Sequence, residues 1–106
     1  MALAEKRCEP CHSGGTPLPP EETRELAKET PAWTLKEKAI EREFRFPDFR
    51  QAMDFVNRVA AVANAEDHHP DIHISYGTVR LELSTHKIGG LSQNDFIVAA
   101  KIDALL

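Results

Sequence analysis

The stretch DHHPDIHISYGTVRLELSTH, residues 67–86, contains the alternation that decides the fold and four of the five histidines of the chain. Apolar and polar residues alternate over residues 72–76 and again over residues 79–85, with Gly77-Thr78 between the two runs. Strict alternation is typical of a strand with one buried face. The stretch therefore predicts a β-hairpin with its turn at Gly77-Thr78. Pro70 requires any preceding helix to end at or before His69.

The clearest predicted helix lies directly upstream of this hairpin, over residues 49–67. Its apolar residues recur at spacings of three and four, which places them on one face of a helix. Asp48 is a candidate N-cap because its carboxylate can accept a hydrogen bond from a free amide of the first turn. Phe55 and Val62 widen the apolar stripe and indicate a second contact surface.

A second strand pair and two further helices complete the predicted order. The strands are expected at residues 33–35 and 40–46, joined near Glu37-Lys38, and the helices at residues 21–29 and from Ser92 to about residue 105. Two hairpins with the helices segregated from them are typical of the α+β class. We therefore expect one four-stranded antiparallel sheet with three helices packed on one face, in the order helix-strand-strand-helix-strand-strand-helix.

Length, charge and composition narrow the possible functions. The 106 residues suffice for one domain. Residues 1–19 contain Gly14-Gly15 and several prolines, so we expect a flexible tail there and a single domain over residues 20–106. The formal net charge is −4, which does not favour direct nucleic-acid binding. No run of about 20 apolar residues predicts a membrane span. Residues 1–10 lack the apolar core of a secretory signal, so we expect a cytoplasmic protein without membrane association.

The histidines supply the candidate chemistry. His68 and His69 follow Asp67 at the end of the long helix, while His86 ends the last strand and Asp95 begins the last helix. Imidazole exchanges protons near neutral pH, so such a cluster indicates acid–base catalysis or a metal site. An adjacent histidine pair cannot easily bind one ion from a regular element, and we expect no metal. Ordinary helix caps and surface histidines are the remaining alternative.

The segment Cys8-Glu9-Pro10-Cys11-His12 matches the Cys-x-x-Cys-His pattern of covalent haem attachment. Attachment of that kind requires export, for which no signal is predicted. A redox pair and half of a zinc site are the other interpretations. We expect no cofactor here.

Three runs and one acid resemble the pterin-4a-carbinolamine dehydratase family, and the cysteine-bearing N-terminal segment resembles that of its bacterial members. These are Glu66-Asp67-His68-His69-Pro70-Asp71, Leu83-Ser84-Thr85-His86, Gly89-Gly90-Leu91-Ser92 and Asp95. The similarity extends from about Trp33 to the C-terminus. It implies the same α+β fold.

The resemblance also implies an activity. The substrate would be 4a-hydroxytetrahydropterin released by an aromatic amino acid hydroxylase, and the product quinonoid dihydropterin, in tetrahydrobiopterin recycling. His68 and His86 would form the acid–base pair, and His69 would hold the pterin and assist. No metal or cofactor is implied, and a homodimer or homotetramer is expected.

Further residues of the same runs would support the substrate or the histidines. Asp95 would orient a histidine or bind the ring, although a carboxylate in a first helical turn also caps the helix. Asp67 is a second candidate for orienting a histidine. The supporting set is completed by Pro70, Ser84 and Thr85.

Other functions remain open. A relative in animals also acts as a dimerisation partner of a transcription factor, so a non-catalytic regulatory role is one alternative. Another is a different pterin step, for example one related to molybdopterin. A third is a small metal-binding protein that uses Cys8, Cys11 and histidines. Residues 71–74 depart from the aromatic residues of animal members, which leaves the shape of the pocket open.

Overall fold

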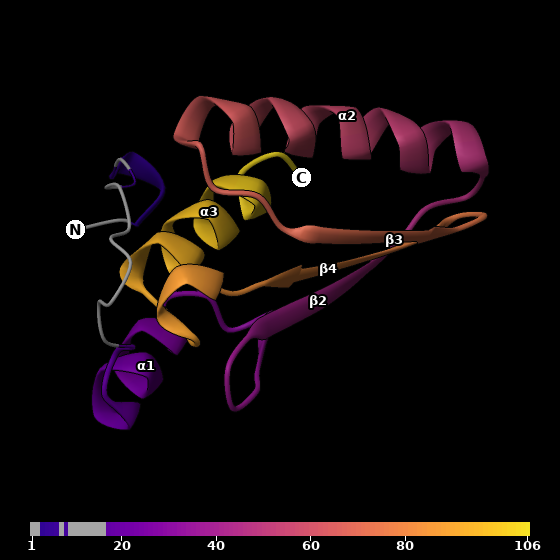
Figure 1. Cartoon of the computed structure of the whole chain (residues 1–106). Coiled ribbons are helices and arrows are strands. Elements are labelled where there is room, and N and C mark those ends of the chain that lie inside the picture. The colour runs from indigo at the N-terminus through magenta and orange to yellow at the C-terminus, as the bar shows by residue number, and fades with distance from the viewer. Residues whose placement is uncertain (1–2, 7, 9–16) are drawn as a thin grey trace.

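The computed structural model describes residues 3–6, 8 and 17–106. Within them, three α-helices and four strands follow the predicted order, and two short 3-10 helices are added (Figure 1). The bounds are η1 (Leu3–Glu5), α1 (Pro20–Ala27), β1 (Thr34–Leu35), β2 (Ile40–Arg45), α2 (Phe49–Glu66), β3 (Asp71–Ser75), β4 (Thr78–Leu83), η2 (His86–Ile88) and α3 (Gln93–Asp103).

The four strands form one antiparallel sheet in the order β1-β2-β4-β3. Both predicted hairpins are present, and the pairing of β2 with β4 joins them in the middle of the sheet. In that pairing Ile40 lies opposite Leu83 and Phe44 lies opposite Val79. Figure 1 shows α2 running along the sheet, and α3 packs against α2. The predicted α+β fold is therefore confirmed.

The core lies between the sheet and the apolar face of α2. Val79, Leu81 and Leu83 are fully buried, as the alternation in β4 predicts, and Phe55 and Val59 of α2 are buried with them. Burying a side chain of this size stabilises the fold by about 1.5–3 kcal/mol. In the described part of the chain, no helix is both long and apolar enough to cross a membrane.

The β3 hairpin differs from the prediction in two ways. Its turn is centred one residue earlier, and Tyr76 is 68% exposed rather than packed in the core. Gly77 lies so close to β2 that a Cβ atom there would be 2.3 Å from the carbonyl oxygen of Phe46. This close approach leaves no room for a side chain at Gly77, and the neighbouring Tyr76 adopts a left-handed backbone (φ 52°) in the turn. Because β3 is an edge strand, Ile72 is also 37% exposed, and the predicted buried face is largely absent.

Part of the stretch expected to be a tail contacts the domain. Leu3 is only 2% exposed, and η1 packs against α3. Further along, Leu18 donates its amide hydrogen to the carbonyl oxygen of Leu91. The division at residue 19 stays a prediction, and Cys11 and His12 lie outside the described residues.

Candidate active site

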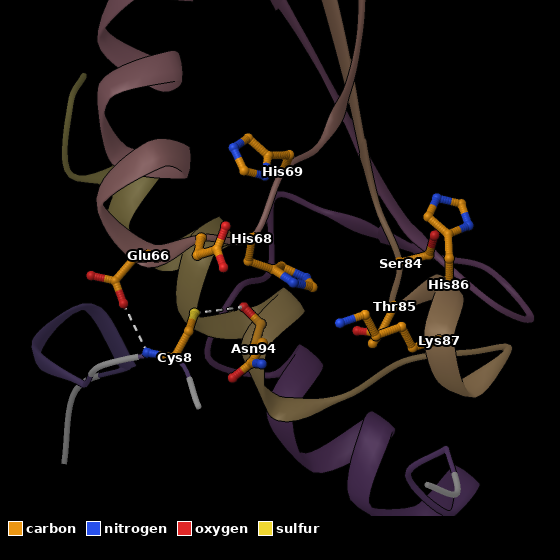
Figure 2. A pocket seen from close by; sticks show the side chains of 10 residues that line it. Cys8, Glu66, His68, His69, Ser84, Thr85, His86, Lys87 and Asn94 are labelled. Atoms are coloured by element: carbon orange, nitrogen blue, oxygen red, sulfur yellow. Dashed lines mark hydrogen bonds between the residues drawn. The ribbon is translucent and has the colours of Figure 1, made fainter. Parts of the chain in front are cut away.

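A pocket of about 420 Å³ lies between the end of α2, the segment after β4 and the start of α3 (Figure 2). All three histidines that were predicted to be catalytic line it. Its walls are formed by Cys8, Glu66, Asp67, His68, His69, Ser84, Thr85, His86, Lys87 and Asn94. The fold thus brings together two histidine-bearing segments that are separated by a whole hairpin.

The end of α2 directs the first histidines. Asp67 adopts the left-handed conformation (φ 52°, ψ 42°) that commonly ends a helix. The amide of His68 then donates to the carbonyl oxygen of Ala63, which closes the last turn. Pro70 prevents any continuation of the helix. It is half-buried and does not itself line the pocket, although it was predicted as a supporting residue.

His68 is held by a buried carboxylate. Its Nε2 atom lies 2.6 Å from Oδ1 of Asp95, whose side chain is fully buried. The second oxygen of Asp95, Oδ2, accepts hydrogen bonds from the Ser92 amide and the Thr85 hydroxyl, each at 2.9 Å. Asp95 therefore caps α3, as the sequence predicts, and also fixes the ring of a histidine in the pocket.

The hydrogen bonds of this network can be assigned a consistent set of donors. With the Thr85 hydroxyl donating to Asp95, the Ser92 hydroxyl is the donor to Oγ1 of Thr85 across 2.7 Å. A carboxylate accepts hydrogen bonds, so we assign the hydrogen of the contact with Asp95 to Nε2 of His68. The ring nitrogen of His68 that Asp95 does not engage is therefore Nδ1.

The other two histidines are more exposed. Nε2 of His69 lies 2.9 Å from Oδ1 of Asn64, which ties this ring back to the last turns of α2. His86 lies across the pocket from His69 (Figure 2). It begins η2 rather than ending β4, because Thr85 and Gly90 form an isolated bridge that closes a loop between them. The strand predicted to end at His86 is therefore three residues too long, since β4 ends at Leu83.

Four pocket residues were not predicted as site residues: Cys8, Glu66, Lys87 and Asn94. Cys8 donates its amide hydrogen to Oε1 of Glu66 at 2.8 Å, and its thiol lies 3.7 Å from the carbonyl oxygen of Asn94. Burial, followed by the nearby Glu66 carboxylate, raises the pKa of the Cys8 thiol to about 12. The sequence indicated a possible role for Cys8 only through the Cys-x-x-Cys-His pattern that it shares with Cys11. No spacing in the sequence relates Cys8 to α2.

In the part of the chain that the structure describes, no group of three or more His, Cys, Asp or Glu side chains could hold a metal ion. Residues 11 and 12 of the Cys-x-x-Cys-His segment lie outside this part. Its cysteine at position 8 faces Glu66 and Asn94 instead.

Fold and site together define a small α+β protein with a pocket lined by three histidines, one of which is held by a buried carboxylate. The family model described as Pterin 4 alpha carbinolamine dehydratase matches residues 16–105. The chain belongs to this family of hydro-lyases.

Relatives match over nearly the whole length of the chain. A protein of Halorhodospira halophila, provisionally named a pterin-4-alpha-carbinolamine dehydratase, is 48% identical over 99% of this chain and 98% of its own length. A protein of Nitrosomonas eutropha with the same provisional name is 50% identical over 98% of this chain and 93% of its own length.

Solved structures share the fold. A Brucella melitensis protein described as a transcriptional coactivator/pterin dehydratase superposes with a TM-score of 0.80 at 32% identity, over 85% of this chain and 98% of its own. A pterin dehydratase-like protein described as a RuBisCO assembly factor in the alpha-carboxysome superposes with a TM-score of 0.57 at 23% identity, over 69% of this chain and 84% of its own. The second similarity shows the fold alone.

Proposed function

We propose that this protein dehydrates 4a-hydroxytetrahydropterin to quinonoid dihydropterin, as a step of tetrahydrobiopterin recycling. The observation that carries the proposal is the pairing of His68 with the buried Asp95 at 2.6 Å, in a pocket that His69 and His86 also line. Membership in the pterin-4-alpha-carbinolamine dehydratase family supports the same substrate class.

The reaction needs two proton transfers. A proton reaches the hydroxyl group on carbon 4a, and the C–O bond breaks as water leaves. The lone pair of nitrogen 5 forms the C=N double bond, and the proton of that nitrogen is removed. Each well-placed acid or base contributes about 10²- to 10⁴-fold to the rate. Two imidazoles that face the same flat ring can perform both transfers without a cofactor.

The contacts support different roles for the three histidines in proton transfer and substrate binding. His68 donates from Nε2 to Asp95 and so has Nδ1 left for the substrate. Asp95 stabilises the imidazolium that forms whenever His68 takes up a proton. His86 supplies the second imidazole from the opposite wall, and His69 holds the pterin. Either His68 or His86 can act first as the acid.

The physiological setting extends the proposal. An aromatic amino acid hydroxylase is the class of enzyme that produces a 4a-hydroxylated tetrahydropterin, and we propose a functional link to one. Assembly as a homodimer or homotetramer likewise stays a prediction. Light scattering coupled to size-exclusion chromatography measures the mass of the assembly directly.

A regulatory role is the second candidate. The Brucella melitensis relative is described as both a coactivator and a pterin dehydratase. Here Phe49, at the start of α2, is 51% exposed and could contact a partner protein. A purely regulatory role predicts that substitutions of the pocket histidines leave the function intact.

The decisive assay generates 4a-hydroxytetrahydropterin with an aromatic hydroxylase and follows its decay by absorbance. We expect the wild type to accelerate the decay, and His68→Ala and His86→Ala each to lower kcat by about 10²-fold or more. His73→Ala is the matched control, since His73 is exposed on β3 and does not line the pocket. A wild type no faster than the uncatalysed reaction would contradict the proposal and favour the regulatory role or another pterin.

A further inference from the structure

The described N-terminal residues reach the pocket through Cys8, which lines it, while residues 3–6 connect this segment to the domain. We call residues 3–6 and 8 the N-terminal wall. Leu3 is 2% exposed within the main hydrophobic core, and η1 packs against α3. Cys8 then lines the pocket beside Glu66 and Asn94 (Figure 2). The wall is thus anchored in the core at one end and borders the histidine site at the other.

Glu66 joins this wall to two helices. It is the last residue of α2, and its side chain is 6% exposed. Oε1 accepts the amide hydrogen of Cys8 at 2.8 Å, and Oε2 lies 3.9 Å from Nζ of Lys101 on α3. The Cys8 thiol in turn faces the carbonyl oxygen of Asn94 at 3.7 Å. One buried carboxylate therefore connects α2, α3 and the N-terminal wall next to the catalytic histidines.

The chemistry of Cys8 favours a structural contribution. The thiolate is the reactive form of cysteine. Burial and the nearby Glu66 carboxylate raise the pKa of the Cys8 thiol to about 12, so the group stays protonated at neutral pH. It presents a neutral, weakly polar surface to the pocket and not a nucleophile. A flat heteroaromatic ring is well suited to contact such a surface.

We propose that the N-terminal wall determines how tightly the pocket binds its pterin, and that Glu66 is the positioning residue that holds the wall in place. This inference rests on the proposed function for the identity of the ligand. A pocket that loses one wall buries less of a flat ring, so binding weakens while the histidines keep their partners. The wall thus acts on KM and the histidines act on kcat.

The test compares three variants with a control. Glu66→Ala removes the acceptor of the Cys8 amide, and Glu66→Gln keeps an oxygen for it. Leu3→Ala loosens the wall from a site that does not line the pocket. The control is Asp54→Ala, an exposed acid of the same helix α2. Thermal melting shows that each variant is folded at the assay temperature.

The first readout is binding and turnover. We expect Glu66→Ala and Leu3→Ala to raise KM, and the dissociation constant of the unreactive probe 7,8-dihydrobiopterin, by about five- to tenfold, as for one lost hydrogen bond. We expect kcat to stay within about twofold, Glu66→Gln to restore most of the affinity, and Asp54→Ala to resemble the wild type. Unchanged dissociation constants, or a loss confined to kcat, would overturn the proposal.

The second readout does not depend on the pterin. In a Cys11→Ser background Cys8 is the only thiol, and its alkylation by iodoacetamide reports how firmly the wall is held. We expect Glu66→Ala and Leu3→Ala to speed the alkylation about tenfold or more, and Asp54→Ala to leave it unchanged. Equal alkylation rates would overturn the role of Glu66 even in an active dehydratase. Suppose the wall variants bind dihydrobiopterin more weakly but the wild type does not turn over the carbinolamine. The proposed reaction is then wrong, and the inference about the N-terminal wall stands.

Discussion

Asp95 combines two functions in one side chain. Its Oδ2 atom caps α3 through the Ser92 amide, and its Oδ1 atom holds the ring of His68. Because the carboxylate is fully buried, each of these hydrogen bonds matters more than it would at the surface. Local spacing predicts the cap, and the family resemblance implied that Asp95 orients a histidine or binds the ring. Which of these holds depends on the packing of α2 against α3, because Asp95 and His68 lie 27 positions apart.

Substitution of Asp95 by Asn tests the second function. The side chain keeps its size and one oxygen for the Ser92 amide, but an amide NH₂ group facing Nε2 favours the opposite tautomer of His68. We expect kcat to fall by about 10²- to 10⁴-fold with a smaller change in KM. Nitrogen-15 NMR of the imidazole checks the tautomer. An unchanged tautomer and kcat would contradict the role assigned to Asp95.

Thr85 is expected to matter for stability as well as for the site. Thr85→Val removes the hydroxyl that donates to Asp95 and accepts from Ser92, so each of these two groups loses one hydrogen bond. We expect the free energy of unfolding to fall by about 1–3 kcal/mol in urea titrations. Thr85→Ser keeps the hydroxyl and is the matched control. A valine variant as stable as the serine variant would show that the hydroxyl is dispensable.

At the scale of elements, the two loops that frame the sheet and the site depend on glycine for different reasons. Gly77 needs space, because a Cβ atom would lie 2.3 Å from the Phe46 carbonyl oxygen. Gly89 needs a left-handed backbone (φ 69°), and no other atom would contact its Cβ within 4 Å. The two reasons for requiring glycine, steric conflict at residue 77 and backbone conformation at residue 89, can therefore be tested separately in one protein.

Alanine and asparagine substitutions make that separation. Gly77→Ala is expected to destabilise the fold by about 1–3 kcal/mol through overpacking, and Gly77→Asn at least as much. Gly89→Ala should lower the free energy of unfolding by about 1 kcal/mol. Gly89→Asn should lower it by less, because asparagine tolerates the left-handed region. Urea unfolding measures all four variants. If Asn improved on Ala at both positions alike, the steric explanation for Gly77 would be wrong.

The elements themselves were largely predictable, since α2 and β4 carry strong local periodicity. The exceptions have physical causes outside the local sequence. The alternation from Ile72 to Tyr76 predicted a buried face, but β3 lies at the edge of the sheet and remains mostly exposed. The end of β4 was placed too late, because the pairing of Thr85 with Gly90 closes a loop that alternation does not reveal.

At the scale of the whole molecule, the site is assembled from four distant parts of the chain. Its histidines were predictable from their residue types and from the resemblance to a known family. The contribution of Cys8 was not, because it depends on a contact with Glu66 across 58 positions. The sequence indicated a flexible segment there, and only the burial of Leu3 shows how the N-terminal residues reach the pocket.

The same contact predicts a pH dependence of stability. The pKa of the Cys8 thiol is raised from 9.0 to about 12 in the folded protein, so between these values the folded state binds more protons than the unfolded state. Stability from this group is present below pH 9 and is lost as pH rises toward 12. In a Cys11→Ser background, we expect the urea midpoint to fall more steeply above about pH 9 with Cys8 present than after Cys8→Ala. Parallel curves for the two proteins would contradict the raised pKa.

The central claim is that His68 and His86 act on one substrate in one reaction. A double-substitution cycle tests it most directly, with kcat measured for the wild type, His68→Ala, His86→Ala and the double variant under saturating 4a-hydroxytetrahydropterin. Residues that act as a unit are strongly non-additive. The account predicts that the double variant is little slower than the slower single variant. Losses that multiply, or single variants as fast as the wild type, would contradict it.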